Sequence, residues 1–174
     1  MSHTNPGPDE IRQMLRDIHS IAVVGLSPKP ARPSFQVAQA MQSHGYRIVP
    51  VRPRHGGAEP SGAGVAASHL LPQSAGCASN VSKVRPLVQE VLGEPAWPDL
   101  ESLPFAVDLV DVFRAPEHVP AIVDSCIKLG VPRLWLQDGV IHEEAAQRAR
   151  EAGITVVMDR CIWRDYYQLG VANG

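Results

Sequence analysis

The chain has 174 residues, of which 44% are hydrophobic, a size and composition that predict a single domain over 1–174 with a sizeable core. Its 16 Lys and Arg residues against 18 Asp and Glu residues give a formal charge of -2. This balance excludes a global positive field for nucleic acid or an anionic membrane surface, so any anion-binding site must be local. No apolar run approaches the ~20 residues that span a bilayer, and residues 1–10 are polar without a secretory or transit signal.

The cysteines point to a reducing compartment. Cys77, Cys126 and Cys161 are odd in number, lie far apart and form no CxxC pair, which disfavours both a disulfide framework and a zinc site. The histidines that follow the predicted strands also lack the spacing of metal ligands. We therefore expect a cytoplasmic protein without a bound metal.

Short β-branched runs alternate with longer helical patterns along the chain. Helices are predicted over 8–18, 34–44 (with Ser34 as its N-cap), 116–129 and 142–152. Strands are predicted over 20–24, 46–51, 109–113, 133–136 and 154–158. Because a strand that follows a helical crossover runs parallel to the strand before it, this order predicts an α/β fold. We expect a three-layer Rossmann-like fold, a mostly parallel five-stranded sheet with helices on both faces.

Residues 56–86 do not fit this alternation. The segment is rich in Gly, Ala, Ser and Pro and has no sustained period, which is typical of a solvated irregular insertion. A short helix over 83–91 is expected to close it. The segment is either a functional lid or an inert insertion, and its composition favours the inert insertion because it offers little with which to hold a ligand.

The loop after the first predicted strand is a candidate anion site. In open parallel sheets, ligands bind beyond the carboxyl ends of the strands, where the strand order reverses. Only Gly25 stands where a dinucleotide fingerprint would have three glycines, and three prolines reduce the supply of backbone donors. Side chains must then supply much of the contact, or else the loop is a rigid solvated turn. The candidate side chains are Ser27, Lys29, Arg32 and Ser34.

Arginine replaces the expected acidic residue after the second strand. The segment reads Val51-Arg-Pro-Arg-His55, whereas an NAD-binding unit has an acidic residue there to hold the ribose hydroxyls. Arg52 suits a phosphorylated ribose, either the 2′-phosphate of NADP or the 3′-phosphate of coenzyme A (CoA). The alternative is a pair of surface arginines.

Two later loops also carry arginines. Arg114 leaves the third strand just before a helix and either reaches a pyrophosphate or pairs with Glu117 at the surface. Asp159 and Arg160 follow the last strand, where a structural ion pair between them is the favoured interpretation.

Taken in order, six segments resemble the YccU-type CoA-binding proteins, stand-alone relatives of the CoA-binding domain of the succinyl-CoA synthetase α subunit. These segments are Gly25-Leu-Ser-Pro-Lys-Pro, Val51-Arg-Pro, Leu92-Gly-Glu-Pro-Ala-Trp97, Val107-Asp-Leu-Val-Asp-Val-Phe-Arg114, Leu134-Trp-Leu-Gln137 and Val157-Met-Asp-Arg-Cys-Ile162. The resemblance covers about 11–162, broken by 56–86. It implies a Rossmann-like fold that holds CoA across the ends of its strands.

Carried over by position, the resemblance implies a role for each strand-end residue. Those near the pyrophosphate would be Gly25, Ser27, Lys29 and Arg32. Those flanking the adenosine would be Val51, Arg52 and Pro53. Those lining the middle and far wall of the groove would be Phe113, Arg114 and Gln137. The phosphohistidine and partner subunit of the synthetase have no visible counterpart.

The leading hypothesis is a module that binds CoA or an acyl-CoA without catalysis of its own. An NADP-dependent oxidoreductase shares the arginine argument, but the chain has no Tyr-x-x-x-Lys pair, and Tyr166 and Tyr167 are interpreted as packing or tail residues. A third hypothesis is a mixed disulfide between CoA and Cys161, whose thiol follows Arg160. A buried, inert cysteine is the favoured interpretation there. The oligomeric state and any partner enzyme are left open.

Overall fold

The computed structural model describes residues 4–52 and 87–171. Its centre is a parallel five-stranded sheet in the order β2-β1-β5-β6-β7, which confirms the predicted Rossmann-like class. The strands are β1 (Ser20–Val24), β2 (Arg47–Val51), β5 (Leu109–Val112), β6 (Arg133–Leu136) and β7 (Thr155–Val157). Each lies within one of the predicted strand ranges.

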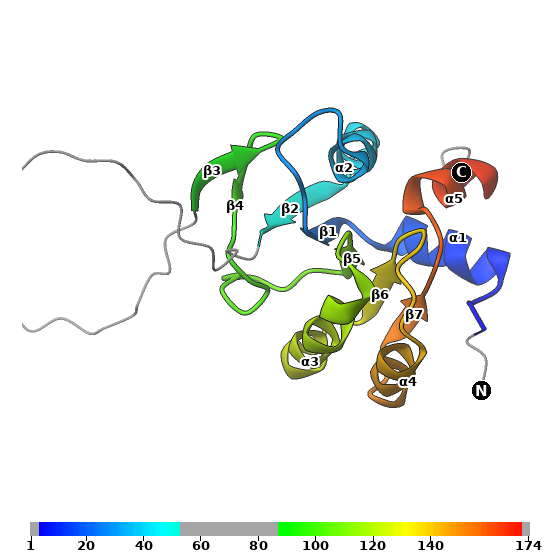
Figure 1. The fold of residues 1–174 in the computed structure, drawn as a ribbon. Coiled ribbons are helices and arrows are strands. Elements are labelled where there is room, and N and C mark those ends of the chain that lie inside the picture. Colours follow the sequence, from blue (N-terminus) through cyan, green and yellow to red (C-terminus); the bar gives the residue numbers. More distant parts are fainter. Residues whose placement is uncertain (1–3, 53–86, 172–174) are drawn as a thin grey trace, which may run out of the picture.

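Helices cover both faces of this sheet, so the fold has three layers (Figure 1). One face carries α1 (Pro8–Asp17), α2 (Pro33–Ser43) and α5 (Ile162–Gln168), and the other carries α3 (Val119–Leu129) and α4 (Glu143–Glu151). A short 3-10 turn, Pro116–His118, precedes α3. No helix within 4–52 or 87–171 has the length and apolar character needed to cross a membrane.

The distribution of core residues follows from the two-residue period of side chains along each strand. Side chains alternate between the two faces of a strand, and a parallel sheet covered on both faces needs apolar residues on each. In β1, Ala22 and Val24 pack with α3 and α4, whereas Ile21 and Val23 pack with α1, α2 and α5. All four side chains are buried, which explains why the strand reads as a continuous apolar run.

Three predictions about elements need correction. Arg32 rather than Ser34 is the N-cap of α2, because Pro33 takes the first helical position and moves the N-cap back by two residues. The helix expected over 83–91 is wrong where the structure describes it, since β3 (Leu87–Val91) forms an antiparallel hairpin with β4 (Glu94–Ala96). Helix α5 was not predicted at all.

The hairpin extends the fold beyond the edge strand β2. Its turn consists of Leu92 and Gly93, both with positive φ angles, which matches the twist of a two-residue hairpin. The amide of Trp97 donates to the Pro50 carbonyl at 2.9 Å, and the Arg52 amide donates to the Trp97 carbonyl at 2.8 Å. The hairpin is therefore attached to the carboxyl end of β2. The insertion expected over 56–86 lies outside the described residues. The same is true of 83–86, the first part of the helix expected over 83–91.

Candidate anion-binding site

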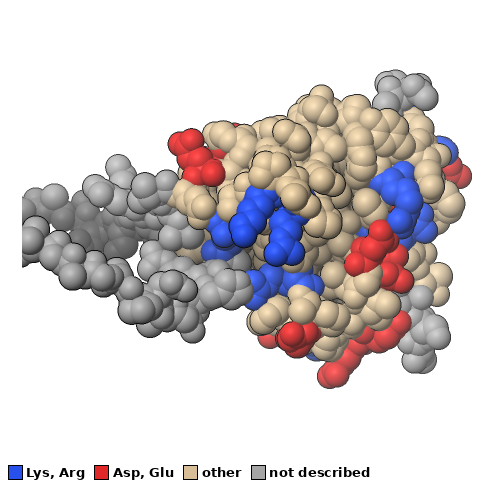
Figure 2. Space-filling model, turned by 45° about the horizontal axis from the view of Figure 1, so that its top comes forward, with Lys and Arg blue, Asp and Glu red and all other residues tan. Residues whose placement is uncertain are grey.

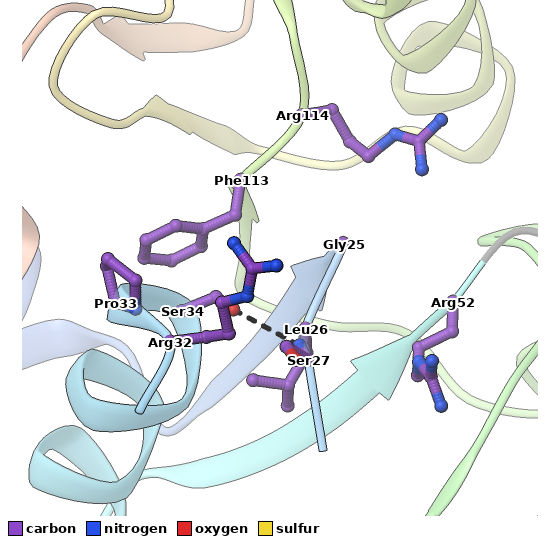
Figure 3. Close-up of a pocket in the computed structure, with 9 residues that line it drawn as sticks. All are labelled: Gly25, Leu26, Ser27, Arg32, Pro33, Ser34, Arg52, Phe113 and Arg114. Atoms are coloured by element: carbon purple, nitrogen blue, oxygen red, sulfur yellow. Dashed lines mark hydrogen bonds between the residues drawn. The ribbon is translucent and has the colours of Figure 1, made fainter. Parts of the chain in front are cut away.

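A cavity of about 400 Å³ opens where the strand order reverses. The chain passes from β1 to β2 on one side and later to β5 on the other, so the loops after these strands diverge and leave a crevice between them. The residues that line it are Gly25, Leu26, Ser27, Arg32, Pro33, Ser34, Arg52, Phe113 and Arg114 (Figure 3).

Gly25 lets the first two strand ends approach the third. Its φ angle is +89°, and a Cβ atom there would lie 2.6 Å from the carbonyl oxygen of Phe113. Its amide donates to the Val51 carbonyl at 2.8 Å, while the Phe113 amide donates to the Val24 carbonyl at 2.9 Å. The single glycine of this loop is thus needed for close backbone packing at the base of the cavity.

The loop between β1 and α2 is tied to itself by two side-chain hydrogen bonds. The Ser27 amide donates to Oγ of Ser34 at 3.1 Å, and the Lys29 amide donates to Oγ of Ser27 at 3.2 Å. Both hydroxyl groups act as acceptors here and keep their own protons for donation to a ligand. No side chain of the described residues caps the N-terminus of α2, which begins at Pro33 on the cavity wall. The positive end of the helix dipole therefore adds to the favourable potential for an anion.

Among the described residues, three arginines and no acidic side chain line this cavity. Arg32, Arg52 and Arg114 come from three different loops and lie on different sides of Gly25 (Figure 3). Lys and Arg side chains gather at the centre of the face shown in Figure 2. A chain with a net charge of -2 thus concentrates positive charge at one place. This arrangement suits a ligand with several negative charges.

The structure does not bring every predicted residue to the cavity. Lys29 is exposed in the loop but does not line the cavity, and Val51 is buried beneath it. Gln137 is only 4% exposed and is turned toward a buried neighbour rather than the cavity. Pro53 lies outside the described residues.

Asp111, which the sequence analysis did not single out, is the neighbour of Gln137. Nε2 of Gln137 donates to Oδ1 of Asp111 at 2.8 Å, and both residues are buried. Burial raises the pKa of Asp111 to about 7, although hydrogen bonds from Gln137 and from the Val112 amide oppose this shift. The sequence signal that could have identified Asp111 is an acidic residue inside an otherwise apolar strand. Acidic side chains are rarely fully buried, so such a position is unusual.

A family comparison decides where the chain belongs. The model of a family described as "CoA binding domain" matches residues 19–74 and 67–166. The chain belongs to this CoA binding domain family. The two matched segments overlap at 67–74, within the irregular stretch expected over 56–86.

Relatives of this CoA-binding-domain chain cover nearly its whole length. It is 34% identical over 158 residues to the uncharacterized protein YneT of Bacillus subtilis, covering 91% of this chain and 93% of YneT. A hypothetical protein from Pyrococcus horikoshii has a solved structure with a TM-score of 0.72 and 28% identity, covering 97% of this chain and 99% of its own. A Thermus thermophilus protein gives a TM-score of 0.72 and 29% identity, with 94% and 99% covered.

A larger enzyme shares the fold of this domain. The dinucleotide-forming acetyl-coenzyme A synthetase 1 of Ca. Korarchaeum cryptofilum aligns with a TM-score of 0.55 and 19% identity. The alignment covers 84% of this chain and 27% of the synthetase.

The last loop of the domain differs from the prediction. The expected pair between Asp159 and Arg160 is wrong: Nε and Nη2 of Arg160 donate to the buried carboxylate of Asp165 at 2.5 and 2.9 Å. Asp159 instead accepts from the Gly139 amide at 2.7 Å. Because Asp165 neutralises Arg160, the cation beside the Cys161 thiol is already paired. Cys161 is partly exposed rather than buried, and it does not line the arginine-rich cavity.

The two tyrosines after the last strand belong to helix α5. Tyr166 is buried in the core and stacks with Trp163 at a centroid distance of 6.1 Å, which confirms its packing role. Tyr167 is 54% exposed and makes an edge contact with Trp163 at 4.1 Å.

Proposed function

We propose that this protein binds CoA or an acyl-CoA at the carboxyl ends of β1, β2 and β5, with its arginines on the phosphates and without chemistry on the ligand. The observation that carries the proposal is the convergence of Arg32, Arg52 and Arg114 on one cavity, with no acidic residue among the described residues that line it. Membership of the CoA binding domain family supports CoA as the polyphosphate ligand.

The position of each arginine suggests which phosphate group of CoA it contacts. In doubly wound sheets the residue after the second strand faces the ribose, so we assign Arg52 to the 3′-phosphate of CoA. Arg32 precedes α2 and Arg114 follows β5, on the two sides of Gly25. We assign this pair to the pyrophosphate, together with the uncapped N-terminus of α2.

The charges are sufficient for physiological affinity. Hydrogen bonds to charged groups contribute roughly 1.5–3 kcal/mol each, so three arginine–phosphate contacts and the helix end support micromolar binding, about -8 kcal/mol. Among the described residues, neither Arg32 nor Arg114 has a side-chain hydrogen-bond or ion-pair partner that would compete with a phosphate.

Isothermal titration calorimetry with CoA, dephospho-CoA and NADPH tests the assignment. Changing Arg114 to Ala should weaken CoA and dephospho-CoA alike by roughly 10- to 100-fold, because both ligands carry the pyrophosphate. Arg52→Ala should weaken CoA but leave dephospho-CoA unchanged. Arg16→Ala is the matched control, since Arg16 is exposed on α1 beside another cavity near the amino ends of β1 and β2.

Two outcomes would refute the proposal. Absence of CoA binding to the wild-type protein at millimolar concentration would show that CoA is not its ligand. Tighter binding of NADPH than of CoA would instead favour the 2′-phosphate, because an arginine after the second strand suits either phosphorylated ribose.

A further inference from the structure

Arg52 differs from the other two arginines of the cavity in having a side-chain hydrogen-bond partner among the described residues. Nη1 of Arg52 donates a hydrogen bond to Oε1 of Gln89, which lies on β3. Arg32 and Arg114 have no such side-chain partner within the part of the chain that the structure describes. The guanidinium group at the end of β2 is therefore oriented by the protein before any ligand arrives.

The hairpin that carries Gln89 is anchored at both ends. At one end, the Arg52 amide donates to the Trp97 carbonyl at 2.8 Å, so the hairpin also holds the backbone of Arg52. At the turn, Nε2 of Gln42 on α2 donates to the Leu92 carbonyl at 3.0 Å. Between them Val91 is 2% exposed and packs in the core. Gln89 thus belongs to a framework that is in fixed register with β2.

The chemical nature of the partner matters as much as its position. A carboxylate in place of Gln89 would orient Arg52 but would also neutralise its charge. The amide oxygen of glutamine accepts the same hydrogen bond and leaves the full positive charge available. An arginine side chain loses much rotational freedom when it binds a phosphate, and a partner formed beforehand lowers that loss.

We infer that Gln89 is a positioning residue that orients Arg52 toward the 3′-phosphate, so that the β3–β4 hairpin sets the preference of the cavity for a 3′-phosphorylated ribose. This inference rests on the proposed function. It concerns selectivity between CoA and dephospho-CoA, whereas the proposed function concerns CoA binding itself.

The test measures dissociation constants of CoA and dephospho-CoA for the full chain and compares their ratio between variants. Gln89→Ala frees Arg52 and should reduce the preference for CoA by about 2- to 10-fold. Gln89→Glu keeps the shape but pairs with Arg52, so it should reduce the preference at least as much, most strongly at low salt. Gln89→Ala should leave the affinity for dephospho-CoA unchanged, whereas the added negative charge of Gln89→Glu should weaken dephospho-CoA less than it weakens CoA.

Two controls separate positioning from a general effect on structure. Gln39→Ala makes the same substitution at an exposed site of α2 outside the cavity, and should keep the wild-type ratio. In an Arg52→Ala background, Gln89→Ala should have no further effect, because the group that it orients is gone. Circular dichroism of each variant checks that the fold is intact.

Failure of this inference is distinguishable from failure of the proposed function. If Arg52→Ala lowers the ratio but both Gln89 variants keep it, or if they weaken both ligands equally, Gln89 does not position Arg52 and only the inference is overturned. If the wild-type protein binds neither ligand, the proposed function fails and the inference falls with it.

Discussion

Replacing Asp111 with asparagine should remove a large part of the pH dependence of folding stability. Asp111 is 2% exposed, and the pKa of its carboxyl group is raised from 3.8 to about 7, chiefly by burial. Between these two values the folded protein keeps the proton while the unfolded chain has released it. The contribution of Asp111 to wild-type stability should therefore fall as the pH rises from about 4 to about 7 and level off above that.

The size of the effect follows from the two pKa values. Each pH unit between them contributes at most about 1.4 kcal/mol, so the full difference corresponds to roughly 4 kcal/mol. Between pH 5 and pH 8, the expected loss of stability from this one group is roughly 2 to 3 kcal/mol. Asparagine has a similar shape, carries no charge at any of these pH values and can still accept from Gln137.

The assay is urea unfolding followed by tryptophan fluorescence at several pH values. The difference in free energy of unfolding, Asp111→Asn minus wild type, should increase by roughly 2 to 3 kcal/mol from pH 5 to pH 8. Asp17→Asn removes an exposed carboxylate of α1 and should leave the wild-type profile unchanged. Parallel profiles of wild type and Asp111→Asn across this range would refute the argument, since the carboxyl group would then be ionised in the folded state.

Two further substitutions test the packing and the rim of the domain. Gly25→Ala should lower the free energy of unfolding by about 2 kcal/mol or more, because the new Cβ would lie 2.6 Å from the Phe113 carbonyl at a φ of +89°; wild-type stability of this variant would contradict the close approach. Arg160→Ala should cost roughly 3 kcal/mol in urea unfolding, since it leaves the fully buried Asp165 carboxylate unpaired. Arg164→Ala, which removes an exposed pair, should cost no more than about 1 kcal/mol, and equal losses for the two arginines would contradict the reasoning.

The sheet could be predicted because its signals are local. Each strand of the sheet is a short apolar run bounded by turn residues, and right-handed crossovers then leave few arrangements. The prediction of a helix over 83–91 was wrong because the local sequence pattern there is weak. Pairing of Leu87–Val91 with Glu94–Ala96 decides that segment, and the Leu92-Gly93 turn that allows it lacks the usual asparagine or aspartate signal.

The candidate site was predictable in part. Arg32, Arg52 and Arg114 could be proposed because each follows a strand, and the structure brings all three to one cavity. Their contact with phosphates stays a prediction. Gln137 was placed on the wall of the groove, but its amide is used by Asp111. A linear sequence shows which residues follow a strand, but not which of them are already engaged by a residue 26 positions away.

The carboxyl edge of the sheet carries cations in both halves, but only one half keeps their charge available. Near β6 and β7, Asp165 neutralises Arg160 and Asp138 neutralises Arg164, so this half offers little net attraction to an anion. Near β1, β2 and β5, the partner of Arg52 is a neutral amide, and within 4–52 and 87–171 no acidic side chain lines the cavity. Because oppositely charged neighbours cancel at a distance, the distribution of acidic partners, rather than that of the arginines, decides which half of this edge attracts anions.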